Sequence, residues 1–142
     1  MEKIPSFSKN HDTLGVGLHV CGEAHGVTTF DLRFKKPNAG DFISPKALHT
    51  VEHIMATVLR NSDKKDCIIY FGPMGCRTGF YLLTVNLSYN EVLRLLKDGF
   101  KAALDFTEVP GNKHEECGNY SEHDLPEALC ECKKYLEILN KL

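Results

Sequence analysis

The segment 45–60 constrains the fold more than any other part of the chain, because it carries the pattern of an amphipathic helix. Ser44 is a favoured N-cap residue and Pro45 a favoured first helical residue. The apolar residues recur at helical spacing and form one stripe, made by Leu48, Val51, Met55, Val58 and Leu59. Such a helix buries the stripe in a core and keeps a polar flank.

That polar flank carries the sequence His-Thr-Val-Glu-His, with its histidines at positions 49 and 53. Residues four apart lie on one face of a helix, so His49 and His53 can direct two imidazoles at one point. This arrangement is half of a site for a divalent transition metal. Glu52 lies beside them, as a general base or a third ligand. The alternative is two exposed histidines near a glutamate, since short motifs also occur by chance.

A metal site needs at least one more ligand from elsewhere in the chain. The candidates are His114, Cys117, His123 and Cys76. Cys117 lies in a polar loop, flanked by glutamates and by Gly118 and Asn119, where a core cysteine is not expected. Two imidazoles, one thiolate and an open fourth position are typical of a catalytic site, because a structural site is closed.

Cys76 lies in the glycine-rich segment Gly75-Cys76-Arg77-Thr78-Gly79. The glycines permit sharp backbone geometry and close approach of a ligand. A neighbouring cation or metal favours the thiolate, the reactive form of cysteine. The alternative is that the glycines only form a turn and that Cys76 packs there.

Composition indicates one globular domain spanning residues 1–142. The net charge of −2 gives no electrostatic reason to expect nucleic acid or an anionic membrane as a partner. No apolar run approaches the roughly 20 residues that cross a bilayer, and the N-terminus lacks the apolar region of a signal peptide. We therefore expect a cytoplasmic protein with reduced thiols.

The six cysteines include no C-x-x-C pair, which argues against a zinc ribbon or a thioredoxin-like dithiol. Cys21 and Cys67 lie at or beside predicted strands and are expected to be small buried hydrophobic residues. Cys130 and Cys132 point in different directions on a helix and are interpreted as ordinary helical residues.

Alternating hydrophobicity and turn signals predict the elements in the order β-β-α-β-β-α-α. The predicted strands are 14–20, 27–34, 67–71 and 78–86, with a turn at 22–26, and the predicted helices are 45–60, 88–104 and one starting at 124. Strands that follow one another in pairs predict an α+β fold, with a mainly antiparallel four-stranded sheet packed against helices in a single domain. Arg33 is expected on the polar face of its strand, either in solvent or pointing into a site.

In combination, these motifs resemble the LuxS family of S-ribosylhomocysteine lyases, the enzymes of autoinducer-2 synthesis. The resemblance spans essentially the whole chain. The matching segments, in order, are Ser6-Phe7 with His11, Phe30-Asp31-Leu32-Arg33-Phe34 before Pro37-Asn38, His49-Thr50-Val51-Glu52-His53, Gly72-Pro73-Met74-Gly75-Cys76-Arg77-Thr78-Gly79-Phe80-Tyr81, and Cys117-Gly118 with His123-Asp124-Leu125.

The resemblance implies a role for each of eight residues. It implies that His49, His53 and Cys117 hold one divalent metal per subunit, Fe(II), with zinc or cobalt able to substitute. It implies that Glu52 and Cys76 are the general acid/base pair. The implied substrate contacts are Ser6, His11 and Arg33.

The implied reaction moves the carbonyl group of S-ribosylhomocysteine along the ribose and then eliminates homocysteine. The other product is 4,5-dihydroxy-2,3-pentanedione, the autoinducer-2 precursor in quorum sensing, and homocysteine returns to methionine recycling. The resemblance also implies a homodimer whose two active sites lie at the subunit interface. Tyr70, Lys35 and Asn10 depart from the usual acidic residue, cysteine and aspartate of the family.

Two other classes of protein remain alternatives on the residues alone. H-x-x-E-H is also the signature of inverted zincin metallopeptidases, in which Glu52 would activate water. A structural metal module would need a closed site with four ligands, with His114 or His123 in the last position.

Overall fold

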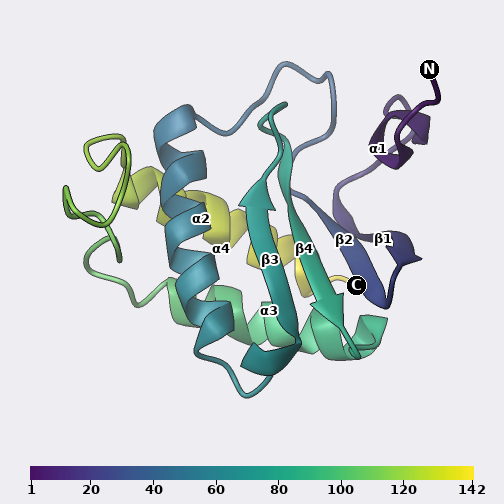
Figure 1. The fold of residues 1–142 in the computed structure, drawn as a ribbon. Coiled ribbons are helices and arrows are strands. Elements are labelled where there is room, and N and C mark those ends of the chain that lie inside the picture. Colours follow the sequence, from purple (N-terminus) through teal and green to yellow (C-terminus); the bar gives the residue numbers. More distant parts are fainter.

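A four-stranded antiparallel sheet forms the centre of the computed structural model, which describes residues 1–142 (Figure 1). The strands are β1 (Gly17–Ala24), β2 (Val27–Arg33), β3 (Ile68–Pro73) and β4 (Gly79–Val85), in the spatial order β1-β2-β4-β3. Every neighbouring pair is antiparallel. This confirms the α+β class and the four-stranded sheet predicted from the sequence.

Three long helices accompany the sheet, and they begin where the N-capping residues predict. They are α2 (Pro45–Arg60), α3 (Tyr89–Ala103) and α4 (Leu125–Leu139). The side chains of Ser44, Ser88 and Asp124 each accept a hydrogen bond from the third backbone N–H of the following helix. A fourth, short helix, α1 (Pro5–Ser8), and a 3-10 turn at Lys65–Cys67 complete the chain. None of these helices combines the length and apolarity needed to cross a bilayer.

The core lies between one face of the sheet and helices α2, α3 and α4. Phe30 and Leu32 of β2 and Phe80 and Leu82 of β4 share this face and are buried. The apolar stripe of α2 packs here, with Val51, Ile54, Met55 and Leu59 fully buried. The core therefore fixes one flank of α2 and leaves the flank with the histidines free for other contacts.

The predicted first strand was displaced toward the N-terminus. Residues 14–16 are not in the sheet, and β1 continues to Ala24 through most of the predicted turn at 22–26. Leu18 is buried, but Val16 and Val20 are 44% and 51% exposed. β1 is an edge strand whose pairing with β2 shifts between Val20 and Gly22, so alternation does not decide which side chains are buried there.

The polar face of β2 is buried. Asp31 and Arg33 are 0% and 1% exposed, and they form an ion pair of 2.6 Å. Lys9, from the N-terminal segment, lies 3.5 Å from the same carboxylate. Gly79 pairs with Arg33 across the strands, and a Cβ atom there would collide with the Leu32 carbonyl. Glycine at this position lets the turn that carries Cys76 approach β2 closely.

The long connection between α3 and α4, residues 104–124, lies beside α2 on the side away from the sheet (Figure 1). It contains Cys117 and His123. The connection and the free flank of α2 together position the group of side chains described next.

Candidate metal centre

His49 and His53 lie one turn apart on α2, and a backbone carbonyl orients each ring. Nδ1 of His49 is 2.9 Å from the Glu122 carbonyl, and Nδ1 of His53 is 2.8 Å from the Pro110 carbonyl. A carbonyl oxygen only accepts, so both Nδ1 atoms carry the proton and both Nε2 atoms carry a lone pair. Fixing the tautomer through the second ring nitrogen is typical of histidines that bind metals.

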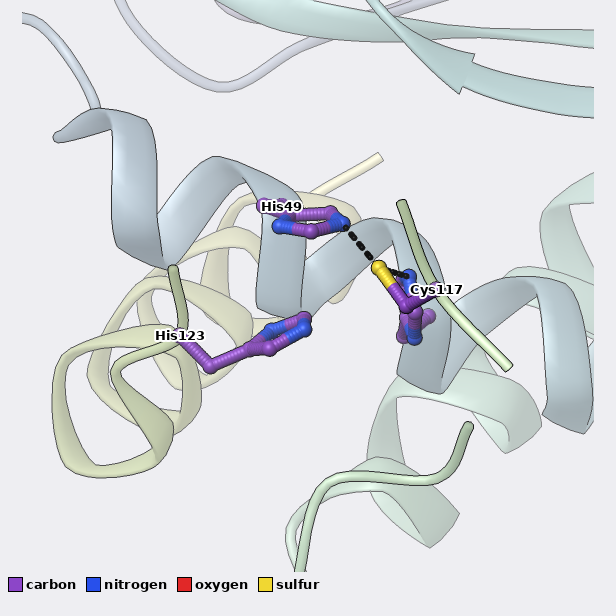
Figure 2. A group of neighbouring side chains, drawn as sticks. His49, Cys117 and His123 are labelled. Atoms are coloured by element: carbon purple, nitrogen blue, oxygen red, sulfur yellow. Dashed lines mark hydrogen bonds between the residues drawn. The ribbon is translucent and has the colours of Figure 1, made fainter. Parts of the chain in front are cut away.

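Cys117 completes a group of three donor atoms (Figure 2). Its sulfur lies 3.5 Å from Nε2 of His49 and 3.7 Å from Nε2 of His53. Tetrahedral zinc with bonds of roughly 2.0 to 2.3 Å separates its ligands by roughly 3.3 to 3.8 Å. The three donors thus have the chemistry and the spacing of a divalent metal site.

Local backbone geometry holds Cys117 and His53 in this position. The Cys117 N–H donates to the Lys113 carbonyl at 3.2 Å, and the sulfur accepts from the Asn119 N–H at 3.4 Å. Gly111 follows Pro110 with a φ of +65°, and a Cβ atom there would lie 3.4 Å from Nδ1 of His53. Glycine therefore permits the turn that brings the Pro110 carbonyl to His53.

His123 is the fourth member of the group. One donor atom from each of His49, His53, Cys117 and His123 lies within 4.8 Å of the others. Burial first, and then the neighbouring His49 and His53, lower the pKa of His123 from its ordinary 6.5 to about 4, against a smaller opposing effect of Glu122. The ring is therefore neutral at pH 7.

The other candidates for metal ligands lie outside this group. Glu52 is half-buried on the same helix and makes no hydrogen bond or ion pair. His114 is exposed and packs against Tyr120 at 5.1 Å between ring centroids. Cys76 lies in a separate group of polar side chains at the end of the sheet.

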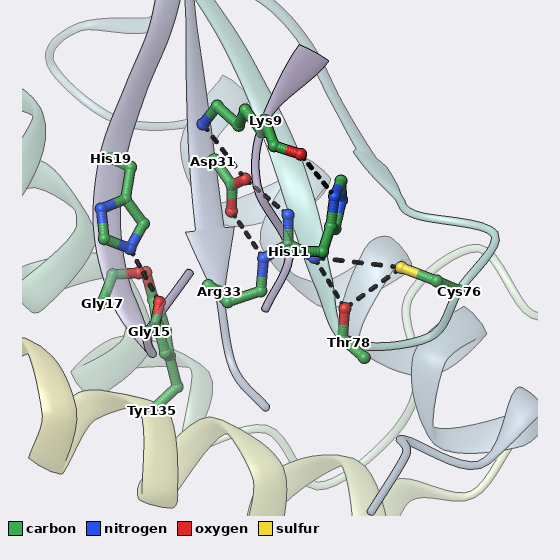
Figure 3. Close-up of polar contacts among 10 residues, drawn as sticks. All are labelled: Lys9, His11, Gly15, Gly17, His19, Asp31, Arg33, Cys76, Thr78 and Tyr135. Carbon is green, nitrogen blue, oxygen red and sulfur yellow. Dashed lines mark hydrogen bonds and ion pairs between the residues drawn. The ribbon is translucent and has the colours of Figure 1, made fainter. Parts of the chain in front are cut away.

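That second group, the Cys76 cluster, consists of Cys76, Arg33, Thr78, Asp31 and His11 (Figure 3). The exposed sulfur of Cys76 is 3.1 Å from the Thr78 hydroxyl and 3.9 Å from a terminal nitrogen of Arg33. Arg33 also donates to Thr78 at 2.7 Å, while its other nitrogens bind Asp31. A guanidinium fixed beside the sulfur stabilises negative charge on it.

His11 reaches the Cys76 cluster from the N-terminal segment, with Nδ1 3.0 Å from the Lys9 carbonyl. Ser6 lies in α1 and makes no side-chain hydrogen bond. It lines a hollow of about 560 Å³ on the open face of the sheet. No hydrogen bond or ion pair connects the Cys76 cluster with the metal centre. The structure thus places the three predicted metal ligands in one group and Cys76, Arg33 and His11 in another, with Glu52 and Ser6 outside both.

Three residues of the metal centre have supporting roles that sequence reasoning missed. The carbonyls of Pro110 and Glu122 carry no side-chain signal, so nothing in the sequence marked them. Thr50 lies between His49 and His53 in the helix motif, and its hydroxyl lies 2.9 Å from Nδ1 of His123. A small hydroxyl residue next to a candidate ligand was the one available signal.

Comparison with known proteins finds, along the whole chain, the same family that the sequence motifs resemble. The family model described as S-Ribosylhomocysteinase (LuxS) matches residues 4–141. The S-ribosylhomocysteine lyase of Borreliella afzelii is 45% identical, over 100% of this chain and 95% of the relative. The corresponding lyases of Phocaeicola vulgatus and Clostridium acetobutylicum are 46% and 42% identical, over 100% of this chain and 93% and 94% of theirs.

Proposed function

This chain belongs to the S-ribosylhomocysteinase (LuxS) family, and we propose that it cleaves the thioether of S-ribosylhomocysteine. The products are homocysteine and 4,5-dihydroxy-2,3-pentanedione, the autoinducer-2 precursor. The observation that carries the proposal is the convergence of His49, His53 and Cys117 at the spacing of metal ligands, in a chain of this family. A peptidase would share with this chain only the short helix motif.

The metal proposed here is one divalent cation per subunit, Fe(II), with zinc or cobalt able to replace it. His49, His53 and Cys117 would hold it, since imidazole suits iron and zinc and thiolate is a ligand that both metals use in proteins. When bound, the cation supplies Lewis-acid stabilisation of negative charge on a carbonyl oxygen of the substrate.

The reaction needs protons to be moved along the sugar. The carbonyl moves from C1 to C2 and then to C3, and each move takes a proton from the carbon beside the carbonyl and returns one to the former carbonyl carbon. With the carbonyl at C3, loss of the C4 proton breaks the bond between C5 and sulfur and expels homocysteine thiolate. The chain must therefore present groups that accept and return protons near carbon.

Glu52 and Cys76 are the proposed general acid/base pair. Glu52 lies next to the metal ligands on α2 and has no competing partner in the chain. The Arg33 guanidinium lies 3.9 Å and the Thr78 hydroxyl 3.1 Å from the Cys76 sulfur, where both can donate to it during proton transfer. In our proposal the Cys76 thiolate acts first and Glu52 serves the later steps. Ser6, His11 and Arg33 contact the substrate.

A homodimer would bring the two groups of residues together. The hollow on the open face of the sheet is lined by apolar side chains such as Ile69 and Leu83, and Phe7 is also exposed. An exposed apolar surface of this kind is typical of an interface. We propose that the Cys76 cluster of one chain completes the metal centre of the other.

A mixed dimer tests that arrangement. Chains with Cys76→Ala and chains with Cys117→Ala are each inactive alone, but a dimer containing one of each keeps one intact site if sites form between chains. Random mixing should then restore about a quarter of wild-type activity. If each site lies within one chain, mixing restores none.

We place the enzyme in the cytoplasm, because all six of its cysteines are free and disulfides are rare in that compartment. The direct test of the function is thiol release from S-ribosylhomocysteine by protein purified without oxygen, with metal content measured alongside. Stoichiometric release of homocysteine thiol is expected. A metal-loaded protein that releases no thiol would overturn the proposal.

A further inference from the structure

The N-terminal segment, residues 1–16, carries two of the proposed substrate contacts but is weakly attached to the rest of the chain. These contacts are Ser6 and His11. Helix α1 buries none of its residues, and Phe7 is 71% exposed. Every hydrogen bond made by residues 1–14 has both partners within the segment itself. Some other interaction must therefore hold His11 at the Cys76 cluster.

One ion pair connects residues 1–14 with the sheet. Nζ of Lys9 lies 3.5 Å from a carboxylate oxygen of Asp31 in β2. The Asp31 side chain is 0% exposed and the Lys9 side chain is 23% exposed. Water and salt screen such a pair less than a pair in which both groups are exposed. Lys9 therefore provides a defined point of attachment for the segment.

The backbone of Lys9 orients His11. The Nδ1–H group of His11 donates to the Lys9 carbonyl at 3.0 Å, since a carbonyl oxygen only accepts. Nε2 is then the ring nitrogen that remains to face a ligand. Figure 3 shows Lys9, His11 and Arg33 together at the end of the sheet that carries Cys76. One residue thus fastens the segment with its side chain and sets the His11 ring with its main chain.

Asp31 does not need Lys9 to balance its charge. Two nitrogens of Arg33 bind the two carboxylate oxygens of Asp31, at 2.6 and 3.1 Å. A third nitrogen of Arg33 donates to Thr78 at 2.7 Å and lies 3.9 Å from the Cys76 sulfur. The Asp31–Arg33 pair is thus complete without Lys9. The Lys9 contact adds a link between this pair and the segment that carries His11.

We propose that Lys9 is a positioning residue, whose ion pair with Asp31 fastens the N-terminal segment so that His11 is held at the Cys76 cluster before the substrate binds. This inference rests on the proposed function. A segment that is already ordered does not have to be ordered at the cost of binding energy. Loss of Lys9 should therefore weaken substrate binding while the fold and the metal ligands stay as they are.

Three variants separate this role from a general effect of charge. Lys9→Met removes the ammonium group but keeps an unbranched side chain and the backbone carbonyl. Lys9→Arg keeps the positive charge and the reach to Asp31. Lys3→Met is the matched control, because Lys3 is an exposed lysine of the same segment and forms no ion pair.

The first measurement does not depend on turnover. NMR relaxation of the backbone amides gives order parameters, which are about 0.85 for a rigid backbone and below about 0.6 for a flexible one. Residues 6–14 should be ordered in wild type, Lys9→Arg and Lys3→Met. In Lys9→Met the same residues should fall below about 0.6, while the amides of β2 and β4 stay unchanged. Equal order in Lys9→Met and wild type would overturn the inference.

The second measurement is thiol release from S-ribosylhomocysteine. Lys9→Met should raise KM about tenfold and change kcat little, because it removes binding that the ground state and the transition state share. Lys9→Arg should recover most of the loss, and Lys3→Met should match wild type. If Lys9 only balanced the charge of Asp31, Lys9→Met would lower the urea midpoint of unfolding and leave KM unchanged. That outcome would overturn the inference.

The third measurement tests whether Lys9 acts through His11. Lys9→Met is added to His11→Ala, and the rise in KM is compared with that of each single substitution. If Lys9 positions His11, the double variant should have nearly the KM of His11→Ala alone. Fold-changes that multiply in full would contradict this route. If the wild-type enzyme releases no thiol, the proposed function fails, and the order parameters still decide whether Lys9 fastens the segment.

Discussion

In the metal centre, a backbone carbonyl orients each ligand histidine. Cys76, by contrast, lies exposed at a turn, where its side chain contacts Arg33 and Thr78. The metal centre has all three of its proposed protein ligands within one chain. The Cys76 cluster has a guanidinium and a hydroxyl in place but is open to solvent. The difference suggests that binding of the metal is built into the single chain and that proton transfer depends on covering Cys76. The predictions below test this contrast, from the largest expected effect to the smallest.

Cys117→Ala should remove metal binding and activity together. Two imidazoles without the thiolate leave only half of the site, so we expect metal content to fall from one per chain toward zero and kcat/KM to fall by at least about 10³. Metal analysis and thiol release measure the two effects. Cys130→Ala, at an exposed cysteine of α4, is the control. A Cys117→Ala protein that retains one tightly bound metal would contradict the assignment of this ligand.

Cys76→Ala should separate the two regions. The substitution removes the proposed proton acceptor and leaves every metal ligand in place, so turnover should fall by about 10² to 10⁴. Metal content should stay near one per chain. The same two assays apply, again with Cys130→Ala as the control. Parallel loss of metal would refute the division of roles between Cys76 and Cys117.

Arg33→Met tests how far the Cys76 cluster depends on a buried charge. Asp31 is fully buried, and Arg33 is its closest cationic partner. Removing one member of such a pair leaves an uncompensated charge, which costs about 3–5 kcal/mol of stability. Urea unfolding at neutral pH measures the change. Lys9 also lies near Asp31, at 3.5 Å, and a loss below about 1 kcal/mol would mean that it replaces Arg33.

Thr50→Val should have the smallest effect of these four substitutions, and the effect should come from hydrogen bonds lost beside the metal centre. The substitution keeps the shape of the side chain but leaves the Asp124 N–H and Nδ1 of His123 without their partner. We expect a loss of about 1–3 kcal/mol in unfolding free energy, with metal content unchanged. Thr57→Val is a matched control on the same helix, since its hydroxyl bonds only to the His53 carbonyl. Equal effects of the two substitutions would argue against a special role for Thr50.

The sequence alone was sufficient for the fold class and for where the three long helices begin, because these depend on local patterns, but it did not predict the short helix α1. The stripe of α2 and the capping residues Ser44, Ser88 and Asp124 act within a few residues, and the structure confirms them. The first strand was predicted too early because β1 is an edge strand. Its exposed side chains do not reflect a simple alternation.

For the site, sequence patterns could identify candidate side chains but not their neighbours. The residues alone left four candidates for the third ligand and favoured Cys117 because it lies in a polar loop, and the family resemblance then implied that Cys117 is the ligand. The separation of Cys76 from the metal centre and the stacking of His123 on His49 depend on long-range packing. So do the carbonyls of Glu122 and Pro110, which carry no side-chain pattern that a sequence could display.

The most direct test of the central claim is the X-ray absorption spectrum of the zinc-loaded protein. The claim is that two imidazoles and one thiolate hold the cation while one position stays open for the substrate. It predicts one sulfur at about 2.3 Å and nitrogen or oxygen atoms at about 2.0–2.1 Å. Adding a substrate analogue in which the carbonyl is reduced to an alcohol should change only the nitrogen and oxygen contribution. A spectrum without sulfur, or one that is identical with and without the analogue, would contradict the claim.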